Sequence, residues 1–555
     1  MAGDAVILFE PDGYLTDGPR LMGRQAAGHA FLRAAVAGRV RDELTCATPH
    51  RVSADVFARV ITALDPKVKP RWAAPGRVDL LCEAGTLYLP GPSLAEQARL
   101  RLRAGPAAYS LVGVTHTTAS HTAMDAIAGL PTEPLAPWDA LICTSAAVLA
   151  TVRTVIEEQA AYLAWRLGPA DGAMLPRLPV IPLGVHCADF AFSDAERRQA
   201  RSELGIAPGE VVALFVGRLS YHAKAHPHAM YVGLEAAAKT TGAKLALVQC
   251  GWFANAPIEQ AIKEGARRYA PSIKSIFTDG KDAGARNRSW AAADLFISLS
   301  DNVQETFGLA PVEAMAAGLP AIVTDWDGYK DTVRDGVDGY RIATVMPSAG
   351  HGAHFAAFYE SGEATYDHYS GLVCRTVSVD LDALVSRLTE LVASPAKRSE
   401  MGLQARSRAR QLFDWTHVYR RYQTLYGELA EARKKALTDA SQSQWLARAP
   451  KSAAARLDPF RAFEEYPTLP LGSGTAIALR PGASATGYAA LARDSMFSYL
   501  PAALPDGALV TALLTRLGSG SMTIDALAEG IGTATQNVVL AAAVLAKMGL
   551  VRVVR

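Results

Sequence analysis

One stretch decides the fold of this 555-residue chain: Ser298-Leu299-Ser300-Asp301-Asn302-Val303-Gln304-Glu305-Thr306-Phe307-Gly308-Leu309-Ala310-Pro311-Val312-Glu313-Ala314-Met315-Ala316-Ala317-Gly318-Leu319-Pro320. It begins at the end of a short apolar run, residues 294–298, which predicts a buried parallel strand. Pro311 fits best in the first turn of a helix, because its φ is fixed and it lacks an N–H group. Gly318 and Pro320 predict the end of that helix, and another strand follows. The order strand, loop, helix, strand is half of a parallel α/β unit.

The loop in this stretch lies where parallel sheets bind ligands, beyond the carboxyl end of a strand. The helix start offers free N–H groups from about Phe307 to Val312, and this end of the helix dipole favours an anion such as phosphate. Glu305 on the loop and Glu313 in the first helical turn flank it. Carboxylates accept two hydroxyl groups at once, which suits the vicinal diols of a sugar or ribose. The alternative is that Glu313 only complements the helix dipole, which is worth about 0.3–1 kcal/mol.

The pattern Glu305-x7-Glu313, with Phe307-Gly308 inside it and residues 314–320 after it, resembles a known signature. It is the signature of retaining GT-B glycosyltransferases of family 4, the glycogen-synthase-like glycosyl transferases group 1. The resemblance covers about residues 5–434. It implies an α/β protein with two Rossmann-like doubly wound domains that face a cleft. It also implies transfer of a sugar from a nucleotide-diphosphate donor to an acceptor hydroxyl, with retention at the anomeric carbon.

The resemblance assigns roles within the stretch. The helix N–H groups would contact the departing diphosphate, Glu305 the sugar hydroxyls and Glu313 the ribose. The donor-binding residues implied here are Glu305, Phe307, Gly308, Leu309, Ala310 and Glu313. No residue is a clear nucleophile, and a retaining route in which the leaving phosphate takes the acceptor proton requires none.

A second loop follows the predicted strand 211–216 and carries two cations. Gly217, Arg218 and Lys224 resemble the family's Gly-Arg-Leu loop, which has a Lys five or six residues after the Arg. Two cations beside a helix N-terminus would clamp a diphosphate, and each charge-assisted hydrogen bond is worth about 1.5–3 kcal/mol. The alternative is an exposed basic loop.

The N-terminal half carries two further candidates. His116 follows the predicted strand 109–114, and the family places a His near here, in contact with the transferred sugar and the reaction centre. His121 competes for this role. Gly23, near the start of a helix expected from about Arg20 to Ala37, matches the family's glycine-containing turn at the cleft. A helix-packing glycine is the alternative. The residues expected to act in the reaction are His116, Arg218, Lys224 and Glu305.

The predicted domains follow from the connector near residue 190, from the closing helix and from a change of composition after residue 437. They are an acceptor-side Rossmann-like domain (1–190), a donor domain (191–415), a helix crossing back (416–437), a linker (438–457) and a winged-helix-like accessory domain (458–555). The second helix expected in the last domain, from Thr533, has no Arg, whereas a phosphate-reading surface needs several basic groups. We therefore expect a protein-interaction or oligomerisation module and no nucleic acid.

Three segments depart from the family or leave their role open. Asp325-Trp326-Asp327 resembles the Asp-x-Asp motif of the other, metal-dependent glycosyltransferase fold, but the expected phosphate ligands are Arg, Lys and a helix end, so no metal is expected. After the strand predicted from Leu319 to Thr324, the family usually has Gly-Gly and a Glu, whereas this chain has Asp327-Gly328 and Asp331. Residues 345–369 form a long insert rich in Gly, His and Tyr. The arginines at 99, 101 and 103 predict a solvated helix end rather than a basic rim.

Bulk properties predict a soluble cytoplasmic protein. The net charge is +2, hydrophobic residues make up 50%, and no apolar run approaches the ~20 residues that span a bilayer, so any membrane contact is expected to be peripheral. The six cysteines show no Cys-x-x-Cys pair, which favours reduced core residues. The first residues lack the basic flank of a signal peptide.

The sequence thus predicts a metal-independent retaining glycosyltransferase of glycan or glycoconjugate biosynthesis. UDP or GDP is the expected nucleotide of the donor, and no other cofactor is expected. The base, sugar, linkage and oligomeric state are not specified, and saccharide, lipid-linked and protein acceptors remain open. One alternative is a sugar-phosphate enzyme on the same fold, an epimerase or phosphorylase. Another is a non-catalytic nucleotide-sugar-binding scaffold that acts through its C-terminal domain.

Overall fold

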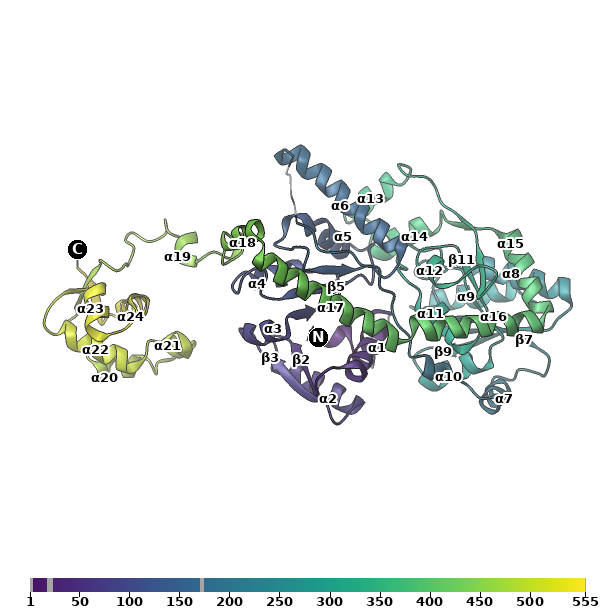
Figure 1. The fold of residues 1–555 in the computed structure, drawn as a ribbon, viewed down its shortest axis with the longest axis horizontal. Helices are drawn as coiled ribbons and strands as arrows, with labels where there is room; N and C mark the ends of the chain where they lie inside the picture. Colours follow the sequence, from purple (N-terminus) through teal and green to yellow (C-terminus); the bar gives the residue numbers. More distant parts are fainter. Residues whose placement is uncertain (1–2, 17–22, 170–173, 555) are drawn as a thin grey trace. The chain divides into compact units, whose positions relative to one another are not determined.

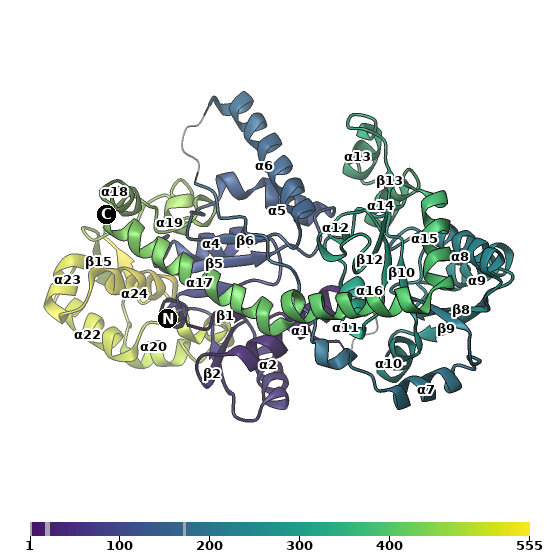
Figure 2. The same cartoon turned by 45° about the vertical axis from the view of Figure 1, so that its right-hand side comes forward.

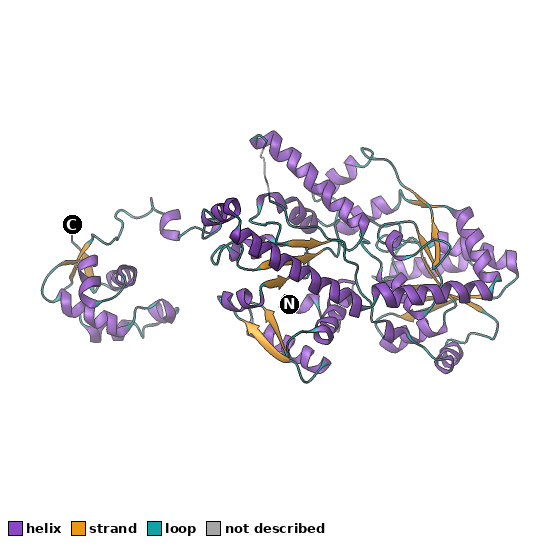
Figure 3. Ribbon diagram, viewed as in Figure 1, coloured by secondary structure: helices purple, strands orange, loops and turns teal. Residues whose placement is uncertain are grey.

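The chain divides into two compact units, Met1–Ala453 and Ala454–Arg555. The computed structural model describes residues 3–16, 23–169 and 174–554. The larger unit contains two α/β domains in which strands alternate with helices along the chain (Figures 1 and 3). Within the described residues, no helix is long and apolar enough to cross a membrane.

The first domain is built on a parallel sheet, which has six strands in the described part of the chain, in the order β3-β2-β1-β4-β5-β6. Its strands are β1 (Val6–Leu8), β2 (Glu43–Ala47), β3 (Lys69–Ala73), β4 (Thr86–Tyr88), β5 (Ser110–Val114) and β6 (Ala140–Ile142). Its helices are α1 (Gly23–Gly38), α2 (Arg51–Leu64), α3 (Val78–Ala84), α4 (Ala95–Arg101), α5 (His121–Ala128) and α6 (Ala146–Leu167). This strand order is that of the Rossmann fold. The predicted helix start at Arg20 lies outside the described residues.

The second domain repeats this order as β12-β11-β10-β7-β8-β9, again all parallel. Its strands are β7 (Val211–Val216), β8 (Leu245–Gly251), β9 (Lys274–Asp279), β10 (Leu295–Ser298), β11 (Ala321–Thr324) and β12 (Gly339–Ile342). Its helices include α7 (Asp194–Glu203), α8 (His228–Thr241), α9 (Ala256–Tyr269), α10 (Ala283–Ala292), α11 (Leu309–Ala317), α12 (Tyr329–Thr332), α15 (Leu381–Ala393) and α16 (Pro395–Arg408). The strand order reverses between β7 and β10, which is where such sheets bind ligands.

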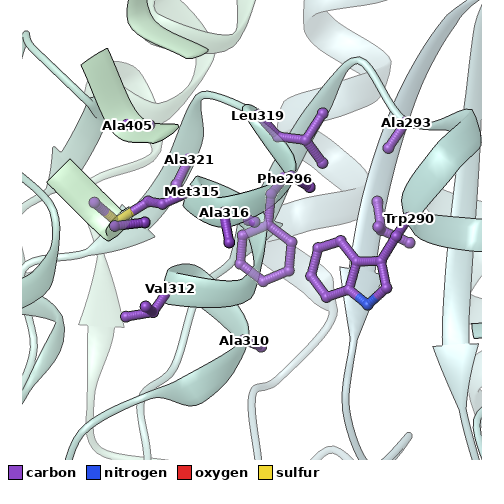
Figure 4. Packing of buried hydrophobic residues seen from close by; sticks show 14 of the residues in the cluster. Trp290, Ala293, Phe296, Ala310, Val312, Met315, Ala316, Leu319, Ala321 and Ala405 are labelled. Carbon is purple, nitrogen blue, oxygen red and sulfur yellow. The ribbon is translucent and has the colours of Figure 1, made fainter. Parts of the chain in front are cut away.

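Helix α11 lies in the core and is buried on most of its circumference. Val312, Met315 and Ala316 pack in one cluster with Phe296 and Trp290, whose rings stack 5.7 Å apart (Figure 4). A helix that is apolar on most sides is stable only when it is enclosed in this way. Its position, and that of its N-terminus, is therefore fixed by packing.

Helix α17 (Trp415–Thr438) returns from the second domain to the first (Figure 2). It follows α16 after a π-helical turn, Ala409–Phe413. Its aromatic face packs into the core of the first domain, where the rings of Trp415, Tyr419 and Tyr422 lie 5.6–6.1 Å from the ring of Phe31. Packing of this kind couples the two domains through one helix.

The segment expected to be a linker is partly helical. Helix α18 (Ala440–Ala447) occupies its first half, because Trp445 and Leu446 pack beside the buried Trp138 and Ala436. The change of composition that predicts a linker does not reveal two apolar side chains that pack on a distant segment.

The smaller unit has a three-stranded antiparallel sheet in the order β16-β15-β17 in the described residues. Its strands are β15 (Ala476–Leu479), β16 (Met522–Thr523) and β17 (Val551–Val553), and its main helices are α22 (Gly507–Leu517), α23 (Ile524–Ile531) and α24 (Thr535–Lys547). Leu513, Leu527 and Leu545 lie in its core. Three helices packed on a small antiparallel sheet form a winged-helix-like arrangement.

Arg101 corrects the prediction of a solvated helix end, because it is fully buried. Its guanidinium donates to both carboxylate oxygens of Asp139, at 2.5 and 2.8 Å, and to the carbonyl oxygen of Tyr109. Asp139 is also fully buried and accepts from the N–H of Leu111. Arg99, by contrast, is half-exposed and forms an ion pair with Glu133, whose side chain is mostly shielded.

We expect Arg101→Met to destabilise the first domain by about 3–5 kcal/mol, because it leaves the Asp139 carboxylate buried without its cation. The shift in the urea-unfolding transition of the first domain measures this loss of stability. Arg99→Met is the matched control and should cost less than about 1 kcal/mol. Equal shifts for the two variants would contradict the structural role of Arg101.

Candidate active site

Two loops meet at the point where the second sheet reverses its order, one after β7 and one after β10. The first begins with Gly217, whose φ of 154° suits glycine. A Cβ atom at Gly251, which ends the neighbouring strand β8, would lie 1.9 Å from the Gly217 carbonyl oxygen. Glycine at 251 therefore lets the two strand ends approach closely, whereas glycine at 217 permits the positive φ.

The predicted cations of the first loop bind side chains of the second loop. Arg218 donates to the carbonyl oxygen of Ala223 at 3.1 Å and to Oε1 of Gln304 at 2.7 Å. Lys224 forms an ion pair with Glu305, and both side chains are largely shielded from solvent. The structure thus brings together Gly217, Arg218, Lys224 and Glu305, although 81 residues separate Lys224 from Glu305.

Burial affects the pKa values of both cations. Burial lowers the pKa of Arg218 from its ordinary value. Burial would also lower the pKa of Lys224, but the adjacent Glu305 carboxylate outweighs this effect and holds that pKa above its usual range. Lys224 therefore stays charged at neutral pH.

The N-terminus of α11 faces the same point without a side-chain cap. Gly308 is its N-cap, at φ 85°, and a Cβ atom there would lie 2.1 Å from Cε1 of the buried Tyr329. Within the described chain, no acceptor receives the N–H groups of Phe307, Gly308, Leu309 or Ala310. Unpaired N–H groups at a helix start form an anion site. The Phe307 side chain itself belongs to the core, so only its backbone faces the site.

Glu313 is the fifth residue of α11, just past the first turn in which the sequence placed it. The helix begins at Leu309, two residues before Pro311. Burial raises the pKa of Glu313 to about 7, against an opposing contribution from Arg286. Its carboxylate has no hydrogen-bond or ion-pair partner among the described residues. A carboxylate here is therefore available to ligand hydroxyls.

His116 belongs to the first domain and faces the loop after β10 of the second domain. Its carbonyl oxygen accepts from the Thr306 hydroxyl at 3.2 Å, which fixes it beside the loop of Glu305. Burial, aided by the charge of Arg24, lowers the pKa of His116 to about 4, so the ring is neutral at pH 7. The competing His121 starts α5 and stacks on Tyr359 of the insert instead.

Gly23 is the first described residue of α1, and Arg24 follows it. Arg24 lies close enough to His116 for its charge to contribute to the lowered pKa of that ring. A Cβ atom at Gly23 would meet nothing within 4 Å, whereas one at Gly28 would lie 2.1 Å from the Gly13 carbonyl oxygen. The helix-packing role therefore belongs to Gly28.

The turn after β11 was not assigned by the sequence, and it contacts the first domain. Asp331 accepts from the N–H of Ala146 at 2.6 Å, at the start of α6, and Asp327 accepts from the Ser145 hydroxyl at 3.4 Å. Burial and the nearby Glu305 charge raise the pKa of Asp327 to about 8. A helix N-terminus attracts a carboxylate, but sequence spacing does not reveal which carboxylate reaches it.

The carboxylates of Asp325 and Asp327 have different partners and do not meet at one site. Asp325 lies 3.5 Å from the Arg341 guanidinium, whereas Asp327 meets Ser145. The described residues contain no group of three or more His, Cys, Asp or Glu side chains that could hold a metal ion.

Two Rossmann-like parallel-sheet domains and a helix that returns to the first domain define the GT-B fold, with the loops described above at its ligand-binding edge. Residues 196–349 match the family model described as "Glycosyl transferases group 1". This segment lies in the second domain and contains Arg218, Lys224, Glu305 and Glu313.

The chain is similar to named enzymes over part of its length. It is 31% identical over 173 residues to D-inositol 3-phosphate glycosyltransferase of Nocardia farcinica, a match that covers 31% of this chain and 37% of that protein. It is 23% identical over 344 residues to alpha-maltose-1-phosphate synthase of Mycolicibacterium smegmatis, covering 59% and 76%. The crystal structure of HepE from Anabaena with UDP and glucose aligns with a TM-score of 0.48 at 15% identity, over 78% of this chain and 99% of that one. Residues 196–349 thus resemble group 1 glycosyl transferases, and the chain spans between about a third and three quarters of the length of these two named relatives.

The raised pKa of Glu313 predicts a pH-dependent stability. The folded state holds its proton more tightly than the unfolded state, whose carboxyl has a pKa of 4.5. The unfolding free energy of the native protein should therefore fall, relative to Glu313→Gln, as the pH rises from 4.5 to about 7. The expected change is on the order of 1–3 kcal/mol.

Chemical denaturation at several pH values measures this difference. Glu400 is exposed, so Glu400→Gln serves as the control. Its unfolding free energy should change with pH in parallel with that of the native protein. Parallel curves for Glu313→Gln as well would show that its carboxyl is not perturbed by burial.

Proposed function

We propose that the protein is a retaining glycosyltransferase that moves a sugar from a nucleotide-diphosphate donor to an acceptor hydroxyl, in glycan or glycoconjugate biosynthesis. One observation carries the proposal: uncapped N–H groups at the start of α11 lie at the same sheet edge as Arg218 and Lys224. Several donors and two cations at one point suit a diphosphate better than any neutral ligand.

In this proposal the diphosphate is held as a leaving group. Negative charge grows on it as the bond to the sugar breaks, and Arg218, Lys224 and the α11 N–H groups stabilise that charge. Because these groups are fixed by packing, they need little reorganisation during the reaction. No metal ion is needed on this account.

Glu305 and Glu313 would bind the hydroxyl groups of the donor. The ion pair with Lys224 orients Glu305, so that its free oxygen can receive a sugar hydroxyl and fix the sugar for reaction. Glu313 has no protein partner among the described residues, which leaves both of its oxygens for the ribose diol.

His116 would line the acceptor side as a neutral hydrogen-bonding group. Its lowered pKa makes it a weak base at pH 7. In a retaining route the leaving phosphate takes the acceptor proton, so no protein base is required. UDP and GDP are the nucleotides proposed for the donor, and a saccharide, lipid-linked or protein acceptor fits this scheme equally.

Ligand-induced thermal stabilisation tests the donor site. A UDP, GDP or ADP sugar at about one hundred times its Kd should add about 2.7 kcal/mol to the unfolding free energy. Arg218→Ala should lose this stabilisation. Arg267→Ala, an exposed arginine of the same domain, should keep it.

A turnover assay then separates an enzyme from a scaffold. Glu305→Gln should retain nucleotide binding and lose release of nucleoside diphosphate. No thermal shift with any nucleotide would overturn the donor site. Binding without turnover would favour a nucleotide-sugar-binding scaffold.

A further inference from the structure

A helical hairpin extends from the second domain after β12. It comprises α13 (Ala353–Glu360) and α14 (Tyr366–Cys374), which lie beyond the segment that matches the family model (Figure 2). Helix α13 buries none of its described residues, whereas α14 buries Ser370, Gly371 and Cys374. The position of α13 therefore depends on individual contacts rather than on a core.

Tyr359 of α13 makes the first of these contacts, and it reaches the first domain. Its ring stacks on His121, with centroids 3.6 Å apart, and its hydroxyl accepts from the His121 N–H at 3.2 Å. The ring of Tyr369 stacks on Tyr359 at 4.6 Å. A residue of the second domain thus sits between aromatic groups of both domains.

Tyr366 of α14 makes the second contact. Its hydroxyl lies 3.3 Å from the hydroxyl of Thr117, which directly follows His116. The hairpin therefore touches the first domain on the segment that begins with the acceptor-side histidine and ends at His121.

The base of the hairpin rests on the loop that carries the two cations. The Cys374 thiol donates to the carbonyl oxygen of Tyr221 at 3.7 Å. A Cβ atom at Gly371 would lie 3.2 Å from Cβ of His222. Tyr221 and His222 lie between Arg218 and Lys224 in the chain. The same hairpin thus joins the diphosphate loop to the acceptor-side segment.

We propose that residues 353–374 are a clasp, which covers the segment from His116 to His121 through Tyr359 on His121 and Tyr366 on Thr117 and must open before an acceptor reaches His116. This rests on the proposed function for the meaning of the acceptor side. An element with few buried contacts opens locally at low cost. Closing it excludes water from the reacting sugar.

Hydrogen–deuterium exchange of the full chain tests the clasp without any substrate. Tyr359→Ala removes the stacking and the hydrogen bond, so the amides of residues 117–123 should exchange roughly tenfold faster. Phe358→Ala, an exposed side chain on the same helix, is the matched control and should leave them unchanged. Tyr366→Phe, which keeps the ring, should accelerate the same segment to a smaller extent.

Faster exchange confined to residues 353–374 would show that the hairpin does not hold the first domain and would overturn the proposal. A second measurement tests gating: release of UDP from UDP-glucose, or GDP from GDP-glucose, without an acceptor. An open clasp admits water, so Tyr359→Ala should release several-fold more nucleotide than Phe358→Ala. Equal release would overturn gating. If neither nucleotide binds, the proposed function fails, while the exchange experiment still decides whether the clasp exists.

Discussion

The second domain is organised around a helix whose start has no cap. α11 is enclosed by apolar side chains, so it cannot shift to satisfy its own first N–H groups. Gly308 adopts a positive φ against the ring of Tyr329, and no side chain fits there to accept a hydrogen bond. Unpaired donors near the interior are costly unless a ligand receives them. This arrangement explains why the loops after β7 and β10 gather charges at the same edge.

Charged side chains near the start of α11 stabilise one another. Lys224 neutralises Glu305, and burial of the pair strengthens their attraction. Glu313 and Asp327 lack such a cation, and burial raises the pKa of both. The site therefore combines fixed positive charge with carboxyl groups that ionise near neutral pH. Perturbed groups of this kind concentrate at functional sites.

Contacts between the two α/β domains differ in strength. α17 packs aromatic side chains into the first domain, and Asp331 accepts from the first N–H of α6. These contacts bury surface or satisfy a helix end, so they resist separation. Tyr359 and Tyr366 contact the segment from His116 to His121 by ring stacking and hydrogen bonding, and α13 buries none of its described residues. The domains are thus joined both by packed or helix-capping contacts and by the side-chain contacts of a helix that has no buried core of its own.

Local signals in the sequence determined the parallel architecture, the span of β7, and the loops that carry Arg218 and Glu305, because periodicity and glycine or proline punctuation act over short distances. They did not reveal β2, β3 and β4, which are short or alternate with exposed polar residues. Only the tertiary structure decided the burial of Arg101, the Lys224–Glu305 pair and the contacts of Asp331 and Tyr359. The Arg101–Asp139 pair joins residues 38 positions apart and the other contacts span longer separations, so each depends on how distant elements pack, which no local pattern encodes.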